Sequence, residues 1–340
     1  MNKKLFSNIL KIFLSLLFLL IAVSAVSFIV SKKSQTKAEA PSSERLILGF
    51  SQIGSESAWR TRNTQSIFEA AEENNIQILY DDAQQKQENQ LKAIRSFIVY
   101  QVDVIAFVPI VEDGWDNVLQ EAKEANIPII IVDRQINADP SLYAGFLGED
   151  GYIEGQNAGN FLVKKCLKSD KDINVLELTG TNNSSVATER GTGFRDVISK
   201  YPQIKIIHSE DGDFLRSRGK EIMNRIIEEN HDLKINNQPI DVIFSHNDSM
   251  TLGLLDVLDQ KNIDYSNTVI ISIDAEQKSI DAMMAGKLNC VVECNPNQGP
   301  ILMQLVQDIA KGKTIPRTTY MKETVFTEDD DFTLYTPRGY

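Results

Sequence analysis

The feature that most constrains the fold is a regular alternation of short apolar runs with longer amphipathic stretches. In the first half of the chain beyond residue 45, this alternation covers residues 46–53, 58–73, 76–80, 87–100, 104–109, 115–125 and 127–132. Near-continuous apolar strands separated by helices are typical of a parallel sheet that is covered on both faces. The pattern therefore predicts an α/β fold built from βαβ units.

The same alternation restarts after residues 145–151 and fills the second half. It predicts helices and strands in turn at residues 152–167, 173–178, 185–199, 204–208, 214–229, 240–245, 250–260, 268–273, 279–285 and 288–292. A last helix is expected at residues 298–310, and residues 319–326 can pack against either half. Because 340 residues correspond to about two domains of average length, we expect two doubly wound parallel-sheet lobes.

The charge balance argues against a nucleic-acid partner. The chain has 47 acidic and 35 basic residues, which gives a net charge of −12. A protein with this excess of negative charge is repelled by phosphate backbones. Its content of 42% hydrophobic and 24% charged residues is that of an ordinary globular protein.

Residues 12–30 form an uncharged apolar segment behind a start that contains three lysines. A secretory signal has an apolar stretch of about 7–15 residues. This stretch is about 19 residues long, and at about 1.5 Å per residue it can span a bilayer core. Residues 38–40 have the small-x-small form of a cleavage site, but Pro41 follows them directly. A cleaved signal and a retained membrane anchor both fit, and either one predicts that the body lies outside the cytoplasmic membrane.

The cysteines and histidines indicate neither a disulfide framework nor a metal site. A lipid-modified cysteine would follow the apolar run directly, whereas the first cysteine is Cys166. Cys290 and Cys294 are four residues apart in an apparent strand, which holds them too far apart for a disulfide. The three histidines lack the spacing of metal ligands. We therefore expect no metal and no cofactor.

Polar residues follow nearly every apolar run. In open α/β sheets, ligands bind outside the carboxyl ends of the strands. Asp, Asn and Gly also follow strands because they suit turns and helix caps, so the set is more informative than any single residue. The segments that follow the predicted strands are residues 51–60, 81–85, 133–134, 179–180, 211–214, 246–248, 274–275 and 293.

The side chains in these segments have the chemistry of a sugar site. Carboxylates, amides and guanidinium groups form paired hydrogen bonds with neighbouring hydroxyls, and Trp59 and Phe214 offer flat apolar faces to C–H surfaces. The positive and negative groups balance, which favours a neutral polyol over a phosphate ester. The groups in this balance are Arg60, Arg134 and Arg190 on one side and Asp133, Asp274 and Glu293 on the other.

Enzymatic interpretations have little support. The first strand is not followed by G-x-G-x-x-G, and the chain contains no G-x-S-x-G, H-E-x-x-H or P-loop motif. A carboxylate pair for glycoside hydrolysis stays open, because it is recognised by a separation of about 5–9.5 Å that a sequence does not give. We expect a binding protein and not an enzyme.

Several motifs, taken in their order along the chain, resemble those of one family. They are residues 49–57, 84–90, 132–134, 177–180, 189–194, 211–214, 246–248 and 272–274. From about residue 46 onward the chain resembles the type I periplasmic sugar-binding proteins of the ribose-binding class, with the galactofuranose-binding proteins of ABC importers as the nearest group. The resemblance implies capture of a monosaccharide between two lobes.

The resemblance also implies a three-stranded hinge that crosses between the lobes near Gly148, Glu293 and Glu323. The implied first lobe comprises residues 45–148 and 295–323, and the implied second lobe comprises residues 149–294 and 324–340. Residues 1–44 then form the signal or anchor and a tether.

Carried over residue by residue, the family pattern assigns Trp59 to stacking on the sugar and Asp133 with Arg134 to its hydroxyls. Two departures leave the ring form of the sugar open: Ile273 stands where the family often has an aromatic, and Ala275 where it usually has glycine. The expected sugar-binding residues are Glu56, Trp59, Arg60, Gln84, Asp133, Arg134, Arg190, Phe214, Asn247, Asp274 and Glu293.

Two partners are compatible with such a protein, which we expect to be a monomer. It can present sugar to an ABC permease, or a retained anchor can make it a sensor subunit that signals to a histidine kinase or chemoreceptor. A transcriptional repressor of related fold would need a basic helix-turn-helix before residue 46. The lipid-compatible run at that position excludes it.

Overall fold

The computed structural model describes residues 45–166, 171–332 and 337–340. The apolar segment 12–30 and the rest of the predicted leader lie outside the described residues, so neither the signal nor the anchor is tested. Every element below belongs to one compact unit, Leu46–Tyr340. Among the described residues, no helix combines the length and the apolar character needed to cross a bilayer.

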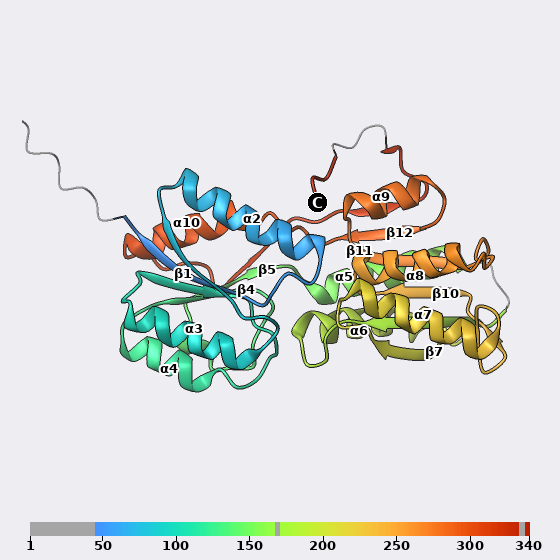
Figure 1. Cartoon of the computed structure of the whole chain (residues 1–340), viewed down its shortest axis with the longest axis horizontal. Helices are drawn as coiled ribbons and strands as arrows, with labels where there is room; N and C mark the ends of the chain where they lie inside the picture. Colours follow the sequence, from blue (N-terminus) through green and yellow to red (C-terminus); the bar gives the residue numbers. More distant parts are fainter. Residues whose placement is uncertain (1–44, 167–170, 333–336) are drawn as a thin grey trace, which may run out of the picture. The chain divides into compact units, whose positions relative to one another are not determined.

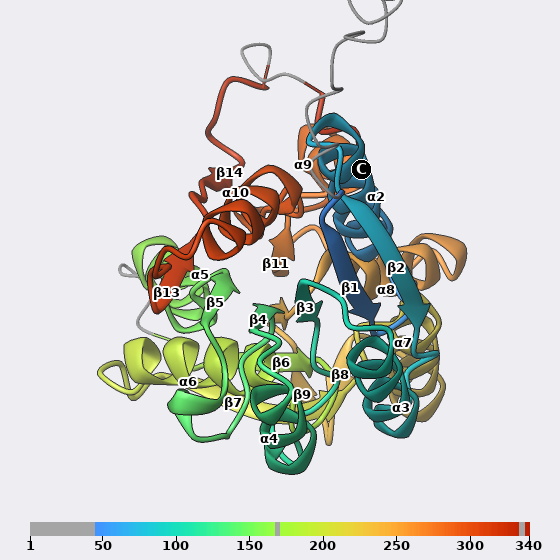
Figure 2. The same cartoon turned by 90° about the vertical axis from the view of Figure 1, so that its left-hand side faces the viewer.

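The first lobe is built on a six-stranded parallel sheet in the order β13-β5-β4-β3-β1-β2, which Figure 2 shows from left to right. Helices α2 and α10 cover one face and α3 and α4 the other (Figure 1). Its strands are β1 (Ile47–Gln52), β2 (Gln77–Asp82), β3 (Val104–Phe107), β4 (Ile129–Asp133), β5 (Gly145–Gly148) and β13 (Thr318–Tyr320). Its helices are α2 (Ala58–Glu73), α3 (Gln87–Val99), α4 (Asp116–Glu124), the short η1 (Pro140–Leu142) and α10 (Gly299–Ala310).

The second lobe repeats this plan with the sheet order β14-β12-β11-β10-β6-β7, in which only β14 runs antiparallel to its neighbour. Its strands are β6 (Ile173–Thr179), β7 (Ile204–Asp211), β10 (Val242–Ser245), β11 (Val269–Asp274), β12 (Cys290–Glu293) and β14 (Val325–Thr327), and a small hairpin pairs β8 (Lys234–Ile235) with β9 (Gln238–Pro239). Its helices are α5 (Gly151–Cys166), α6 (Ser185–Ile198), α7 (Arg216–Asn230), α8 (Asp248–Gln260) and α9 (Gln277–Met284). The prediction of two doubly wound parallel-sheet lobes is confirmed.

The apolar runs become the central strands because helices cover both faces of each sheet. Every residue of β3, β4, β10 and β12 is buried, as a doubly covered parallel sheet requires. Along β1, Leu48 and Phe50 point into the core beneath α2 and α10, whereas Ile105 and Phe107 of β3 pack beneath α3 and α4. This arrangement leaves the carboxyl ends of the strands free to carry a site.

The chain passes between the two sheets three times. It crosses after β5, after β12, and between β13 and β14. Glu149, Cys294 and Glu323 lie in these three crossings. Whether the segments on either side move as the two bodies implied by the resemblance stays a prediction.

Three local features differ from the sequence-based expectations. Residues 145–151 were expected to separate the two halves, but they contain β5, whose glycines permit close backbone packing: a Cβ on Gly145 would lie 2.6 Å from the Pro316 carbonyl oxygen. Residues 319–326 contribute to two strands, one in each sheet. Helix α7 begins at Arg216 and not at residue 214, because Asp213 and Phe214 have φ values of 54° and 59°.

Candidate functional site

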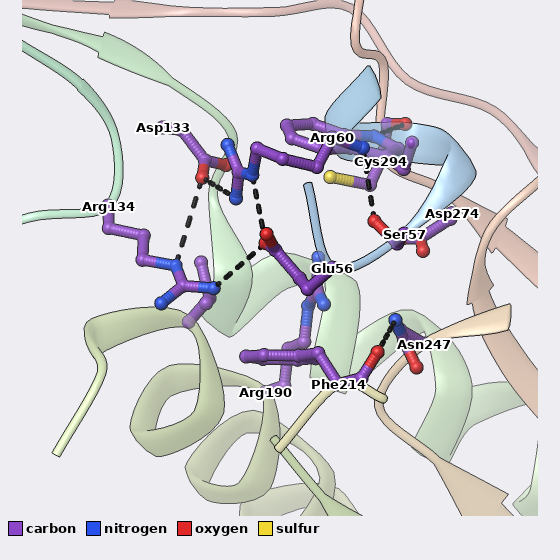
Figure 3. Close-up of a pocket in the computed structure, with 12 residues that line it drawn as sticks. Glu56, Ser57, Arg60, Asp133, Arg134, Arg190, Phe214, Asn247, Asp274 and Cys294 are labelled. Carbon is purple, nitrogen blue, oxygen red and sulfur yellow. Dashed lines mark hydrogen bonds and ion pairs between the residues drawn. The ribbon is translucent and has the colours of Figure 1, made fainter. Parts of the chain in front are cut away.

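A cavity lies where the carboxyl ends of strands from both sheets meet, and the space within it and its opening to solvent amounts to about 310 Å³. Lining residues come from the β1–α2 loop and the end of β4 in the first lobe, and from α6, the β7–α7 loop and the ends of β10 and β11 in the second. This is where ligands bind in open α/β sheets. The lining residues, most of which Figure 3 labels, are Glu56, Ser57, Trp59, Arg60, Asp133, Arg134, Val186, Arg190, Phe214, Asn247, Asp274 and Cys294.

Nine of the eleven expected binding residues line this cavity. Gln84 does not, because it lies in an exposed turn after β2. Its φ is 52°, and its backbone N–H donates a hydrogen bond to the Asp82 side chain. Glu293 does not either, because its carboxylate is paired with Arg338. Sequence reasoning missed that pairing, since nothing in the sequence brings residues 45 positions apart together.

Three lining residues were not expected. Ser57 stands inside the polar segment after β1, but its sequence signal is that of a helix cap, and its Oγ does accept a hydrogen bond of 3.0 Å from the backbone N–H of Arg60. Cys294 directly follows a predicted strand and was interpreted as a core thiol. It is buried, as is Cys290, and neither of these two nor Cys166 forms a disulfide. Val186 is an apolar residue in a helix and carries no signal of a site.

The wall formed by the first lobe is a network of four buried charged residues. Arg60 donates to Glu56 at 2.9 Å and to Asp133 at 2.6 Å. Arg134 lies 3.7 Å from Glu56 and 3.9 Å from Asp133. Figure 3 shows both guanidinium groups between the two carboxylates. The four side chains are at most 5% exposed, so water contributes little to their solvation.

Several polar atoms of this wall have no partner. Glu56 Oε2, Arg60 Nη1 and Arg134 Nε are buried and find no hydrogen-bond partner among the described residues. A buried polar atom without a partner is costly and uncommon in native structures. Because these three atoms belong to residues that line the cavity, they are available to a ligand.

The two arginines of the wall differ electrostatically. Burial opposes the charge of Arg60, but the carboxylates of Asp133 and Glu56 outweigh burial and raise its pKa. For Arg134, burial and then repulsion by Arg60 lower the pKa to about 10. Arg134 remains charged at neutral pH, but its distances to the two carboxylates are longer than those of Arg60. The positive charge of Arg134 is therefore less fully neutralised, which favours further hydrogen bonds to a ligand.

The wall formed by the second lobe is held by its own backbone. Arg190 donates to Glu154 at 2.6 Å and to the carbonyl oxygen of His246 at 2.6 Å. Asn247 caps α8 by accepting from the N–H of Met250 at 3.0 Å, and its amide donates to the Phe214 carbonyl at 3.1 Å. Arg190 and Asn247 therefore already have protein partners.

Phe214 occupies a place made for an aromatic ring. A Cβ on Gly180 would lie 1.8 Å from its Cζ, so only glycine leaves room for the ring there. The guanidinium carbons of Arg134 and Arg190 lie 5.1 and 5.9 Å from the ring centre, within range of cation–π attraction. Phe214 thereby brings together a cation from each lobe.

The backbone is strained at three lining residues. Asp133, Phe214 and Asp274 have φ values of 63°, 59° and 125°. Such conformations cost residues other than glycine about 1–3 kcal/mol each, and they concentrate at functional sites. Each of the three stands at or just after a strand end, where the strain directs its side chain into the cavity wall.

Trp59 links the two lobes as well as lining the cavity. Its indole N–H donates to the Cys294 carbonyl at 2.6 Å, and its backbone N–H lies 3.3 Å from Glu276 Oε1 of the second lobe. Its ring packs with apolar residues of the second lobe, and the Arg60 guanidinium lies 4.6 Å from the ring centre. The predicted stacking of this ring on a sugar is not tested by these contacts.

The formal charge of the lining is balanced. Three arginines face three carboxyl groups, as expected, but the third carboxylate is Glu56 and not Glu293. Burial raises the pKa of Asp274 well above its usual range, although Arg190 opposes that shift. Arg190 is also paired with Glu154 behind the lining, so each arginine has a carboxylate partner even where Asp274 is protonated, and no excess of positive charge favours a phosphate group.

Comparison with known proteins gives the family. The model of the periplasmic binding protein domain matches residues 48–314. The galactofuranose-binding protein YtfQ of Escherichia coli (strain K12) is 39% identical over 313 residues, which cover 91% of this chain and 94% of that protein. The chain belongs to the periplasmic binding protein family.

Solved structures of other family members agree with this periplasmic binding protein in fold. A Mycobacterium smegmatis protein in complex with β-D-fucofuranose is 40% identical, with a TM-score of 0.79 and coverage of 83% of this chain and 91% of that one. The binding protein of an arabinose ABC transporter from Shewanella sp. ANA-3, bound to L-arabinofuranose, is 37% identical, with a TM-score of 0.78 and coverage of 83% and 92%. The resemblance to the ribose-binding class and its galactofuranose-binding group is confirmed.

One group of side chains in this periplasmic binding protein has the geometry of metal ligands, although the sequence predicted no metal site. Glu149, Cys294 and Glu323, one from each crossing, place ligand atoms within 4.8 Å of one another. Burial raises the pKa values of all three, that of Glu323 to about 12. Gln298 donates to both oxygens of Glu149 at 2.9 and 3.0 Å. The raised pKa values work against metal binding, because protons compete with any cation for these atoms.

Proposed function

We propose that the protein is an extracytoplasmic solute-binding protein that captures a neutral monosaccharide in its cavity and presents it to an ABC importer. The observation that carries this proposal is a charge-balanced cavity between two lobes, with buried donor and acceptor atoms that lack partners in the described chain. The similar proteins include a galactofuranose-binding protein, a protein in complex with fucofuranose and the arabinofuranose-bound protein of an ABC transporter, which supports a furanose-type sugar and a role in import.

The unsatisfied atoms suit a hydroxyl group. A hydroxyl both donates and accepts, so one hydroxyl can donate to Glu56 Oε2 while it accepts from Arg60 Nη1 or Arg134 Nε. Trp59 and Phe214 supply apolar faces for the C–H groups of the ring.

Sugar can enter only if the lobes separate. The arginines of the cavity, with Trp59 and Phe214, are at most 4% exposed. Hydrogen bonds join the lobes outside the cavity: the Gln135 N–H donates to Ser185 Oγ at 2.8 Å and the Glu112 N–H to the Asn183 carbonyl at 2.9 Å. In the proposal, residues 45–148 with 295–323 and residues 149–294 with 324–340 move about the three crossings, and sugar favours closure through contacts with both.

Binding without catalysis is part of the proposal. A glycoside hydrolase needs one carboxyl group as a proton donor and another as a base or nucleophile. Glu56 and Asp133 both accept hydrogen bonds from the same arginine, Arg60, an arrangement that does not give the two carboxyl groups the separate roles that hydrolysis requires. Capture of intact sugar is the simpler use of this geometry.

A thermal-shift screen of the purified protein tests the proposal. Galactose, arabinose, fucose, ribose, xylose and fructose are added in turn, with methyl galactofuranoside and methyl galactopyranoside as ring-locked probes. A ligand present at about 100 times its Kd stabilises the folded state by about 2.7 kcal/mol, so at least one furanose-forming sugar should raise Tm by several degrees. If none of them changes the Tm of a protein that is folded by circular dichroism, the proposed function is wrong.

A further inference from the structure

Residues 337–340 belong to the second half of the molecule and lie close to α9 (Figures 1 and 2). The Arg338 backbone N–H donates to Gln277 Oε1 at 2.8 Å, and the Gln277 N–H donates to the Tyr340 carbonyl at 2.7 Å. Tyr340 also packs with the apolar cluster beneath α5 and α6. These contacts fix residues 338–340 against the start of α9, directly after the turn that carries Asp274.

The same residues bind the backbone of that turn. The Tyr340 hydroxyl donates to the carbonyl oxygen of Asp274 at 3.3 Å, and Arg338 Nε donates to that of Ala275 at 3.2 Å. Neither Arg338 nor Tyr340 lines the cavity, whereas Asp274 does. Arg338 and Tyr340 therefore reach the site only through the peptide groups of residues 274 and 275.

The turn needs such support. Asp274 and Ala275 are consecutive residues other than glycine, with φ values of 125° and 65°. Strained backbone of this kind persists only when the surrounding structure over-determines it. The Asp274 carbonyl is held by Tyr340 and the Ala275 carbonyl by Arg338. The backbone is therefore fixed on both sides of the Ala275 α-carbon, and this sets the direction of the Asp274 side chain.

The guanidinium group of Arg338 also joins two strand ends. It donates to Glu293 and to the Tyr340 hydroxyl, the latter at 2.7 Å. Glu293 is the last residue of β12 and pairs in register with Asp274, the last residue of β11. One side chain thus bonds to the last residue of β12 and to Ala275, the residue that follows β11, an arrangement that the planar, five-donor guanidinium permits and a lysine ammonium does not.

We propose that Arg338 and Tyr340 are positioning residues, which hold the Asp274–Ala275 turn in its strained form and thereby set the affinity for sugar without contacting it. This inference rests on the proposed sugar-binding function. It also gives Glu293 a role as the anchor of Arg338 in place of the ligand contact expected from the sequence.

The test uses the full chain with Arg338→Gln, Arg338→Lys and Tyr340→Phe. Arg317→Gln is the matched control, because Arg317 likewise donates to a backbone carbonyl, that of Tyr143, and lies 3.9 Å over an aromatic ring, but in the first lobe. Calorimetric titration uses the sugar that raises Tm most in the thermal-shift screen. The Kd should be about tenfold higher for Arg338→Gln, raised by less for Tyr340→Phe, and unchanged for Arg317→Gln. Arg338→Lys should restore little of the loss. An unchanged Kd in Arg338→Gln overturns the inference.

A double-mutant cycle with Asp274→Asn separates positioning from a general structural role. If Arg338 acts through Asp274, Arg338→Gln should raise Kd by less than about twofold in the Asp274→Asn background. An equal loss in both backgrounds overturns the inference.

Hydrogen exchange of the sugar-free protein supplies a readout that does not depend on binding. The amide of Gln277 and its neighbours in residues 273–277 should exchange faster in Arg338→Gln than in Arg317→Gln. Unchanged exchange there overturns the inference even if no sugar binds. If exchange is faster but the unmodified protein binds no sugar, the proposed function fails while the positioning of the turn stands.

Discussion

The two walls of the cavity solve the problem of buried polar groups in different ways. The wall of the first lobe consists of Glu56, Arg60, Asp133 and Arg134, which pair with one another and leave three polar atoms unsatisfied in the described chain. In the second lobe, Arg190 and Asn247 bond to backbone groups and to Glu154. The comparison teaches that the first wall offers hydrogen bonds to a ligand, whereas in the second Arg190 and Asn247 already have protein partners and help to hold Phe214 in place.

The largest expected effect comes from Asp133→Ala in the first wall. Removing one partner of a buried ionic network leaves Arg60 and Arg134 under-compensated, which typically costs about 3–5 kcal/mol. Sugar-dependent thermal stabilisation should disappear, with Kd raised by about 100-fold or more, while circular dichroism still shows the native fold. Asp103→Ala is the control, because Asp103 accepts one backbone hydrogen bond at an exposed position. If Asp133→Ala keeps its affinity for sugar, the first wall does not supply the hydrogen bonds to the ligand that distinguish it from the second.

A smaller loss is expected from Phe214→Leu in the second wall. Leucine keeps the apolar volume but removes the ring that Arg134 and Arg190 face, and cation–π contacts are worth about 0.5–2 kcal/mol. Calorimetry should give a Kd raised by about tenfold, with a small change in Tm. Phe68→Leu, at an aromatic ring that is 40% exposed, should change neither value. A rise in Kd as large as that of Asp133→Ala would show that the second wall contributes as much to sugar binding as the first.

The contact between the walls outside the cavity predicts a pH dependence. Burial, followed by the charges of Asp150, Glu154 and Glu112, raises the pKa of Glu189 to about 7, and Glu189 Oε1 accepts from Gln135 of the first lobe at 3.1 Å. Because the pKa of Glu189 is raised in the closed form, protonation of Glu189 stabilises that form. This stabilisation is complete below about pH 4.5 and is lost as the pH rises through about 7. Sugar affinity should fall about three- to tenfold between pH 5 and 8.

Glu189→Gln is the variant that assigns this pH dependence. It keeps the hydrogen-bonding shape but does not titrate, so its Kd should vary much less over the same pH range. An equal slope in the variant and the unmodified protein would place the titrating group elsewhere.

The smallest effect is expected on the outer surface of the first lobe. Arg95 and Glu121 form an exposed pair at 2.8 Å, and such pairs contribute about 0–1 kcal/mol. Arg95→Gln should leave Kd unchanged and alter Tm only slightly. Arg60→Gln makes the same substitution at a buried arginine, so the difference between the two variants gives the effect of burial. A similar loss of sugar affinity in both variants would contradict the importance given to the buried network.

Sequence alone predicted those parts of the site that depend on strand ends. Asp133, Asn247 and Asp274 were found because a residue that follows a buried strand must emerge at the carboxyl edge of its sheet. The sequence did not predict which carboxylate balances the third arginine, because Glu293 is diverted by Arg338, 45 residues away. It also missed β5, whose glycines were interpreted as a break although they permit close backbone packing. Contacts between segments far apart in the chain, such as residues 338–340 against the Asp274 turn, leave no periodic signal.

Calorimetric titration of the purified protein with a neutral furanose-forming sugar and with its phosphate ester tests the central claim most directly. A charge-balanced cavity should bind the neutral sugar in a 1:1 complex and bind the phosphate ester at least about 100-fold more weakly, because burying two negative charges without a matching cation is costly. Tighter binding of the phosphate ester, or binding of neither compound, would contradict the account.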